Sequence, residues 1–371
     1  MKSILVITHD TSLSGAPKSL LLILKELKLK GYEITTIAIK GSGALERDFI
    51  KVSINYYNLE NYNTQKIYNI SNRLNRLLYK IPILSEKEKL LNLINDKKFD
   101  CIYANTINSI DLVIKSFLIN DTPIVLHVHE LKTVIDEFRP DLTKIDPYIS
   151  HYIVPSFLNK DTLVTHFTIS PTKISVIRET TVIPECKIEK TENVQKVIMC
   201  GGAYWRKGDD LFIQVASEVI KKLPNTHFYW VGYFSKERFR VNTADIEKLN
   251  LSKNIHLIQE TTTPEVWLYQ SDLFLLTSRE DPFPLAAMEA GMTGLPIICF
   301  EKATGISEVI DQKMVVPYLN VAEMAKKTIE ILNNKDHASA LGQQNKKVFS
   351  KLNPENIALE IDNVIKKIKL D

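Results

Sequence analysis

Two acidic side chains flank the start of a predicted helix in the second half of the chain, within Ser278–Glu289 (SREDPFPLAAME). We predict that this helix begins at Pro284, because proline suits the first helical position. The amino end of a helix presents unpaired N–H groups and a positive dipole end, which suit phosphate or sugar hydroxyls. Asp281 precedes this end and Glu289 lies more than one turn inside, so both carboxylates can accept hydrogen bonds from a ligand. An acidic flank that only satisfies the helix dipole explains the pattern equally well.

A second candidate site is the loop within Val197–Gly208 (VIMCGGAYWRKG), which joins a predicted strand to a predicted helix. Gly201 and Gly202 allow the backbone to approach a ligand closely. Arg206 and Lys207 supply the positive charge that holds a diphosphate. A turn with a solvated basic pair is the alternative interpretation.

Two histidines alternate within Ile124–Glu130 (IVLHVHE), where a strand is predicted. His127 and His129 therefore share one face, as a pair of metal ligands would. No third ligand stands at a recognisable spacing, so we expect no metal site. A role in the core or at a helix cap remains an alternative for His129.

Two loops carry weaker signals. The first, His9–Lys18 (HDTSLSGAPK), contains Ser14-Gly15 but lacks the G-x-G-x-x-G fingerprint of dinucleotide-binding folds. A plain strand-to-helix turn explains it nearly as well. The second, Ala303–Glu308 (ATGISE), carries Gly305 and follows another predicted strand.

The elements that must position these residues alternate between short apolar strands and amphipathic helices. Near-continuous apolar strands separated by helices indicate parallel sheets that are covered on both faces, and hence an α/β fold. The pattern runs once through the first half of the chain and then starts again. The predicted strands are Ile4–Thr8, Glu33–Ile39, Cys101–Ala104, Ile124–His129, Tyr152–Pro155, Lys196–Cys200, His227–Val231, Ile255–Gln259, Leu273–Thr277 and Pro296–Phe300; helices are predicted at Pro17–Leu29, Ser109–Phe117, Asp209–Lys222, from Pro284, and at Asn356–Lys369.

This repetition predicts two doubly wound Rossmann-like domains. A chain of 371 residues is long enough for two domains of ordinary size. We expect an N-terminal domain over 1–185 and a C-terminal domain over 190–350, joined by the polar, aperiodic Ile183–Asn193. Residues 351–371 form a helix that we expect to cross back to the first domain. Ligands bind open α/β sheets at the carboxyl ends of the strands, so the predicted site is the cleft between the domains.

Composition excludes several classes of protein. A formal charge of +3 offers no concentrated basic face, so no nucleic acid partner is expected. The short apolar run of MKSILVITHD is typical of a strand rather than a signal peptide, and no segment reaches the length of a membrane span. Four well-separated cysteines, three of them in apolar strands, indicate buried thiols and a reducing, cytoplasmic location.

The segment Asp281–Glu289 resembles the Glu-x-Phe-Gly-x4-Glu motif of glycosyltransferase family 4, which comprises retaining enzymes of the GT-B fold. The resemblance implies that the first acid contacts the transferred sugar and that Glu289 binds the ribose of the nucleotide. Asp281 is the first acid in register, but Glu280 stands beside it, and either can take that role. Phe283 matches the motif, whereas Pro284 replaces its glycine. Because proline has no N–H, the amide donors that remain are Leu285 and Ala286.

Other parts of the chain are similar to further elements of this family. Arg206 and Lys207 resemble its diphosphate clamp, although the early arginine of that element is a glycine here, Gly201 or Gly202. Gly15 resembles part of the glycine pair that lies near the donor phosphates. His129 matches the histidine that faces the transferred sugar. The loop containing Gly305 and Glu308 resembles one that lines the donor phosphates. The implied site thus comprises His129 and Asp281 as catalytic residues and, for the donor, Gly15, Gly202, Arg206, Lys207, Glu280, Phe283, Leu285, Ala286, Glu289 and Gly305.

The resemblance implies transfer of a hexosyl group, with retention, from a nucleotide-diphosphate sugar to a glycan or lipid-linked acceptor. Leaving-group charge would be stabilised by cations and amides, so neither a cofactor nor a metal is expected. The Lys-, Ile- and Asn-rich composition suits an AT-rich bacterium and, by association, synthesis of surface polysaccharide. The alternatives are a sugar-nucleotide epimerase of the same fold and a catalytically silent subunit that only binds nucleotide sugars.

One segment, Gln65–Lys98, suggests a membrane contact. It contains eight basic and three acidic residues, and apolar residues fall at helical spacing from Ile67 to Ile81. A helix of this kind can lie on an anionic inner leaflet and meet a lipid-linked acceptor. A surface helix packed on the first sheet is the alternative.

Overall fold

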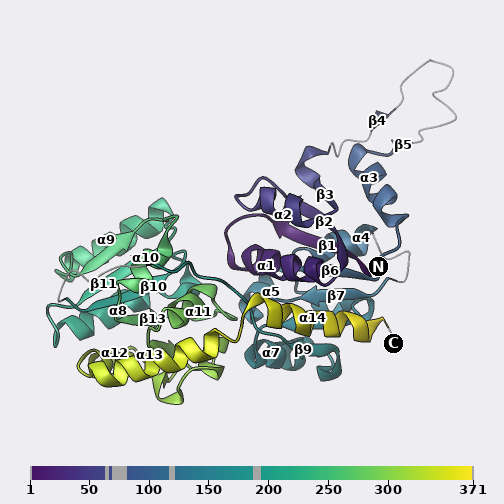
Figure 1. Cartoon of the computed structure of the whole chain (residues 1–371). Helices are drawn as coiled ribbons and strands as arrows, with labels where there is room; N and C mark the ends of the chain where they lie inside the picture. The colour runs from purple at the N-terminus through teal and green to yellow at the C-terminus, as the bar shows by residue number, and fades with distance from the viewer. Residues whose placement is uncertain (1, 63–66, 69–81, 117–121, 187–193, 370–371) are drawn as a thin grey trace.

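The computed structural model describes residues 2–62, 67–68, 82–116, 122–186 and 194–369. Figure 1 shows two lobes, each built on a parallel sheet, with the C-terminal helix lying along the N-terminal lobe. The fold is therefore α/β with two separate sheets, as the repeated strand–helix pattern predicts. Among the described residues, no helix combines the length and apolar character that crossing a bilayer requires.

The first sheet has seven strands in the order β3-β2-β1-β6-β7-β8-β9, all parallel. The order reverses at β1, which is the topological switch point of a doubly wound sheet. Its strands are β1 (Lys2–Asp10), β2 (Tyr32–Lys40), β3 (Asn55–Asn58), β6 (Cys101–Asn105), β7 (Ile124–His127), β8 (His151–Val154) and β9 (Ile174–Val176); its helices are α1 (Gly15–Leu29), α2 (Glu46–Val52), α3 (Glu86–Asn95), α4 (Ile110–Ser116), α5 (Lys132–Phe138), α6 (Leu142–Ile145) and α7 (Phe157–Phe167).

The second sheet repeats this arrangement with six parallel strands in the order β12-β11-β10-β13-β14-β15. Its strands are β10 (Lys196–Cys200), β11 (His227–Val231), β12 (Ile255–Ile258), β13 (Leu273–Leu276), β14 (Ile297–Phe300) and β15 (Val315–Val316); the helices that follow are α8 (Asp209–Ile220), α9 (Lys236–Lys248), α10 (Pro264–Tyr269), α11 (Leu285–Met292), α12 (Val321–Leu332), α13 (Lys335–Phe349) and α14 (Pro354–Ile368).

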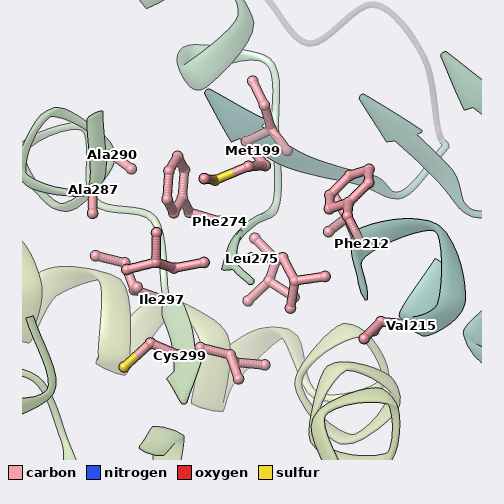
Figure 2. Close-up of a cluster of buried hydrophobic side chains, with 14 of the residues drawn as sticks. Met199, Phe212, Val215, Phe274, Leu275, Ala287, Ala290, Ile297 and Cys299 are labelled. Atoms are coloured by element: carbon pink, nitrogen blue, oxygen red, sulfur yellow. The ribbon is translucent and has the colours of Figure 1, made fainter. Parts of the chain in front are cut away.

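Burial on both faces of each sheet explains why the strands lack polar alternation. In β1, Leu5 and Ile7 pack in one hydrophobic cluster with α3 to α7, while Ile4 and Val6 pack in another with α1, α2 and α14. Successive side chains of a strand point to opposite faces, so both faces need apolar residues. Figure 2 shows the corresponding core of the second lobe, where Phe274 and its neighbours fill the space between strands and helices.

Most predicted elements lie within two residues of their observed bounds, and two predictions need correction. Pro284 is the N-cap of α11, with extended backbone, rather than its first helical residue. The helix predicted through Ile67 is wrong at its start, because Ile67–Tyr68 forms β4, which pairs antiparallel with β5 (Pro82–Ile83). Residues 69–81 of that prediction lie outside the described part, as do 187–193 of the predicted linker.

Helix α14 completes the core of the first lobe. Ile357, Ile361 and Ile365 are buried in the cluster that also contains Val6 and residues of α1. The Asp362 carboxylate of α14 accepts hydrogen bonds from Lys2 Nζ at 2.9 Å and the Tyr32 hydroxyl at 2.6 Å, on β1 and β2. Burial would raise the pKa of Asp362, but these donors and Lys366 hold it at about 2. The C-terminal helix therefore covers a face of the N-terminal sheet.

We expect Ile361→Ala to destabilise the protein by about 2–5 kcal/mol, because it leaves a cavity under α14. Leu359 on the same helix is 46% exposed, so Leu359→Ala is the matched control and should cost less than about 1 kcal/mol. Urea unfolding of both variants measures the difference. Equal losses would mean that α14 is not part of the first-lobe core.

Candidate functional site

The predicted basic loop and the predicted acidic segment meet at the carboxyl edge of the second sheet. Lys207 Nζ donates a hydrogen bond to Asp281 Oδ2, and Arg206 Nη1 lies 3.9 Å from Asp281 Oδ1. Asp281 is buried. Burial lowers the pKa of Lys207; the Asp281 carboxylate opposes this shift, and Arg206 adds to it. The two basic side chains thus lie next to one buried carboxylate.

Glycines shape this loop. Gly208 has φ +71, and a Cβ added there would lie 2.1 Å from the Thr277 carbonyl oxygen. The close approach lets Thr277 Oγ1 donate to the Gly208 carbonyl oxygen at 3.0 Å, which ties the loop after β10 to the end of β13. Gly202 lies against the Tyr204 ring: a Cβ added at Gly202 would stand 2.4 Å from Tyr204 Cε2. The loop therefore holds Lys207 in place through backbone contacts that side chains would disrupt.

The amino end of α11 faces the first lobe. The first N–H bonded within the helix is that of Ala287, to the Pro284 carbonyl at 3.1 Å, so the N–H groups of Leu285 and Ala286 precede the intrahelical pattern. A Cβ added at Gly15 would stand 3.7 Å from Leu285 Cγ. The first loop of the N-terminal lobe and the amino end of α11 are therefore neighbours.

Glu289 receives its hydrogen bonds from residues outside the second sheet. Lys18 Nζ on α1 donates to Glu289 Oε1 at 2.6 Å, and Thr181 Oγ1 donates to the same oxygen at 2.9 Å. Glu289 and Thr181 are buried, and Lys18 is partly exposed. The sequence assigns no role to Lys18 in the first loop and does not reveal Thr181, since no local pattern signals a contact across 108 residues.

The two neighbouring acids face different partners. The Glu280 carboxylate accepts from Thr133 Oγ1 at 2.6 Å and from the Thr133 N–H at 3.3 Å, at the start of α5 in the first lobe. Asp281 instead lies with Lys207. Phe283, which follows them, is buried, and the Arg178 guanidinium lies 5.2 Å from its ring centre.

His129 lies just beyond β7, which ends at His127, and belongs to a buried polar cluster. Its Nδ1 is 2.5 Å from Glu179 Oε1 and its Nε2 is 2.9 Å from Asn105 Oδ1. Burial would lower the pKa of His129, but the Glu179 carboxylate more than offsets this and raises it. With an oxygen at each ring nitrogen, His129 is best described as an imidazolium that donates two hydrogen bonds.

His127 stacks against this group. Its ring centre is 3.8 Å from that of His129, and its Nδ1 lies 2.6 Å from the Tyr103 hydroxyl. Burial and the neighbouring His129 hold the pKa of His127 well below its usual range, so it is neutral, whereas the pKa of Glu179 falls to about 2 because His129 outweighs the effect of burial.

His127, His129 and Glu179 also form a group whose ligand atoms lie within 4.8 Å of one another. Glu179 is the third candidate ligand, which the spacing of the histidines did not reveal because it stands 50 residues from His129. Both ring nitrogens of His129 already have hydrogen-bond partners, Glu179 at Nδ1 and Asn105 at Nε2. The contacts therefore favour a hydrogen-bonded charge pair.

The loop containing Gly305 contacts the first lobe. The Gly305 N–H donates to the Pro282 carbonyl at 2.9 Å, and a Cβ at Gly305 would stand 2.4 Å from Ser156 Cβ. The Glu308 carboxylate, expected beside the donor phosphates, instead accepts from the N–H groups of Phe157 and Leu158 at 3.1 and 2.9 Å and pairs with Arg178. Open amides at the start of α7 and a cation explain this placement.

Comparison with known proteins finds a family match for the second half of the chain. Residues 185–348 match the model of the family described as glycosyl transferases group 1. The chain is 27% identical over 164 residues to an uncharacterized glycosyltransferase of Haemophilus influenzae, covering 43% of this chain and 46% of that protein. It is 29% identical over 153 residues to a poly(ribitol-phosphate) alpha-N-acetylglucosaminyltransferase of Staphylococcus aureus, covering 40% and 30%. The matches thus span less than half the length of these curated relatives.

The whole fold is similar to a solved structure, Anabaena HepE in complex with UDP and glucose, with a TM-score of 0.78, 15% identity and coverage of 99% of this chain and 100% of that one. The two sheets give the chain the GT-B fold. Residues 185–348 thus resemble the group 1 glycosyl transferases, in agreement with the resemblance of Asp281–Glu289 to glycosyltransferase family 4.

The loop geometry yields a stability prediction. Gly208 and Gly294 both have positive φ, but a Cβ at Gly294 would meet no atom closer than 3.9 Å. We expect Gly294→Ala to cost about 1–2 kcal/mol, from the left-handed backbone alone. Gly208→Ala should cost more because its Cβ also meets the Thr277 carbonyl. Chemical denaturation of both variants tests this, and equal costs would contradict the close approach.

Proposed function

We propose that this protein transfers a hexosyl group from a UDP-sugar, with retention of the anomeric configuration, to a glycan or lipid-linked acceptor. The observation that carries the proposal is the meeting of Lys207, Arg206 and Asp281 beside the amino end of α11, whose Glu289 is bonded to the opposite lobe. The choice of donor is supported by UDP in the complex of the similar HepE fold.

The donor diphosphate would lie between the two cations and the N–H groups of Leu285 and Ala286. Lys207 would exchange its partner Asp281 for phosphate oxygens, and its positive charge would oppose the negative charge that grows as the sugar leaves. Preorganised donors in a site shielded from water make the largest contribution to this kind of catalysis. Asp281, released from Lys207, can then accept a hydrogen bond from a sugar hydroxyl.

His129 would face the transferred sugar from the first lobe. Its Nε2–H now points to Asn105 Oδ1, and a sugar hydroxyl can replace that acceptor. On the donor side, Lys18 and Thr181 both bond to Glu289 Oε1, so the second oxygen, Oε2, is the one available to a ribose hydroxyl. The acceptor hydroxyl would enter on the face from which the diphosphate leaves, which gives retention.

For the acceptor, we propose a bacterial surface polysaccharide or its lipid-linked precursor. The support is the similarity to a Staphylococcus aureus enzyme whose name identifies poly(ribitol-phosphate) as its acceptor. The Lys-, Ile- and Asn-rich composition is consistent with this origin.

A donor screen followed by product analysis tests the proposal. Thermal shifts with UDP-, GDP-, dTDP- and ADP-sugars identify the donor, since a ligand at 100 times its Kd stabilises by about 2.7 kcal/mol. The selected donor is then incubated with and without polyol and glycan acceptors. Transfer that requires an acceptor supports the proposal; an altered sugar from donor alone identifies an epimerase. Binding without transfer or hydrolysis identifies a silent subunit.

Lys207 and Glu289 should differ in kinetic effect. Lys207→Ala removes a charge-assisted contact that strengthens as the sugar leaves, worth about 1.5–3 kcal/mol, so kcat should fall at least about tenfold. Glu289→Ala should mainly raise the donor KM, because the ribose is held equally before and during reaction. Steady-state kinetics on one donor separates the two. Unchanged kinetics in both variants would move the active site elsewhere.

His129→Ala should lower turnover strongly while donor affinity stays within about threefold, the signature of a contact made in the transition state. Calorimetric titration with UDP gives the affinity, and circular dichroism melting gives the stability. A joint collapse of affinity and stability would assign His129 to the core instead.

A further inference from the structure

Three successive polar residues in the segment that leaves β9 are nearly fully buried: Glu179 is 5% exposed, Thr180 0% and Thr181 1%. Connections between sheets usually run over the surface, where water satisfies their polar groups. A buried connector depends instead on protein partners for its polar side chains. Those partners show what the segment does.

Each of the three side chains bonds to a different part of the molecule. Glu179 contacts His129 in the first lobe. Thr180 Oγ1 donates to the Leu352 carbonyl at 2.8 Å, just before α14. Thr181 Oγ1 donates to Glu289 at 2.9 Å, in the second lobe. Two residues separated by a single position thus bond to one candidate site residue on each side of the interface.

We propose that Glu179 and Thr181 are positioning residues that align the two halves of the active site, Glu179 by orienting His129 and Thr181 by orienting Glu289. The proposal deepens the proposed function and rests on it, because it concerns the residues assigned there to the sugar and the ribose. It adds that one stretch of three residues orients His129 in the first lobe and Glu289 in the second.

Glu179 fixes the orientation and the charge of His129. The groups that face the His129 ring are Glu179, Asn105, the neutral His127 ring and the adjacent Glu130. Among these, Glu179 makes the hydrogen bond to Nδ1, which directs Nε2–H towards Asn105 and the sugar side. A glutamine at 179 preserves the shape but removes the negative charge, so burial would then favour neutral His129.

Thr181 fixes one oxygen of Glu289. The Thr181 hydroxyl is buried, whereas Lys18, the other donor to Oε1, is about one-third exposed and has four rotatable bonds. The hydroxyl is therefore the more rigid anchor. Without it, the carboxylate can turn about its last side-chain bond, and Oε2 loses its fixed direction towards the ribose.

For Glu179, the test is Glu179→Gln, in the wild-type and His129→Gln backgrounds. Activity that needs imidazolium declines as pH rises through the raised pKa of His129, so the alkaline limb of kcat/KM should move to lower pH in Glu179→Gln. We expect kcat at pH 7.5 to fall at least about tenfold, UDP affinity to stay within about threefold, and no further loss in the His129→Gln background. NMR titration of His129 should show the lowered pKa without any assay of activity.

For Thr181, the test is Thr181→Val, in the wild-type and Glu289→Gln backgrounds. Loss of one hydrogen bond should weaken UDP binding about three- to tenfold with kcat within about twofold, and should have no effect once Glu289 is Gln. Thr328→Val is the matched control, since Thr328 is also fully buried but donates within α12 to the Met324 carbonyl. Its UDP affinity and kcat should equal those of the wild type.

The outcomes distinguish failure of the proposed function from failure of the positioning roles of Glu179 and Thr181. If the wild type binds UDP but transfers no sugar, the proposed function fails, while the His129 titration and the UDP affinities still decide the positioning roles. Glu179→Gln losses that persist undiminished in the His129→Gln background, or an unmoved His129 pKa, overturn the role of Glu179. Activity that a chelator abolishes and Zn²⁺ restores would make Glu179 a metal ligand instead. Unchanged UDP affinity in Thr181→Val overturns the role of Thr181.

Discussion

The buried carboxylate of Glu289 in the second lobe is neutralised by a cation of the first, Lys18. An uncompensated charge at such a position costs several kcal/mol, so the two lobes are held in the arrangement that brings Lys18 within reach. The other contacts across the interface follow the same logic. Glu308 binds the amino end of α7 and Arg178, and Glu280 binds Thr133 at the start of α5.

Under the proposed function, a bound donor would alter the charges close to this interface. Asp281, the partner of Lys207, directly follows Glu280, which binds Thr133 of the first lobe. Under the proposed function, a donor diphosphate would replace Asp281 as the partner of Lys207, whereas Glu289 would keep Lys18 on Oε1 and offer Oε2. Exchange of one charged partner for another costs less than exposing a bare charge, because the buried groups stay compensated throughout.

The first sheet must bury apolar residues on both of its faces. Its two faces are apolar, and α14, the last helix of the chain, covers one of them although the chain has already built the second sheet. The return of α14 brings Leu352 to the connector, where Thr180 binds it. The connector thus contacts the residue that precedes α14 through Thr180 and the inter-lobe ion pair of Lys18 and Glu289 through Thr181.

Local patterns in the sequence determined the sheets, most element bounds and the two loops that meet at Lys207 and Asp281, because apolar periodicity, glycine and proline act over a few residues. They also placed His129 beside a strand end. Only the tertiary structure decided which groups these residues face: Glu179 for His129, Lys18 and Thr181 for Glu289, Thr133 for Glu280. Those pairs join residues 50 to 271 positions apart, and the choice among buried partners rests on charge compensation in three dimensions, which no local pattern records.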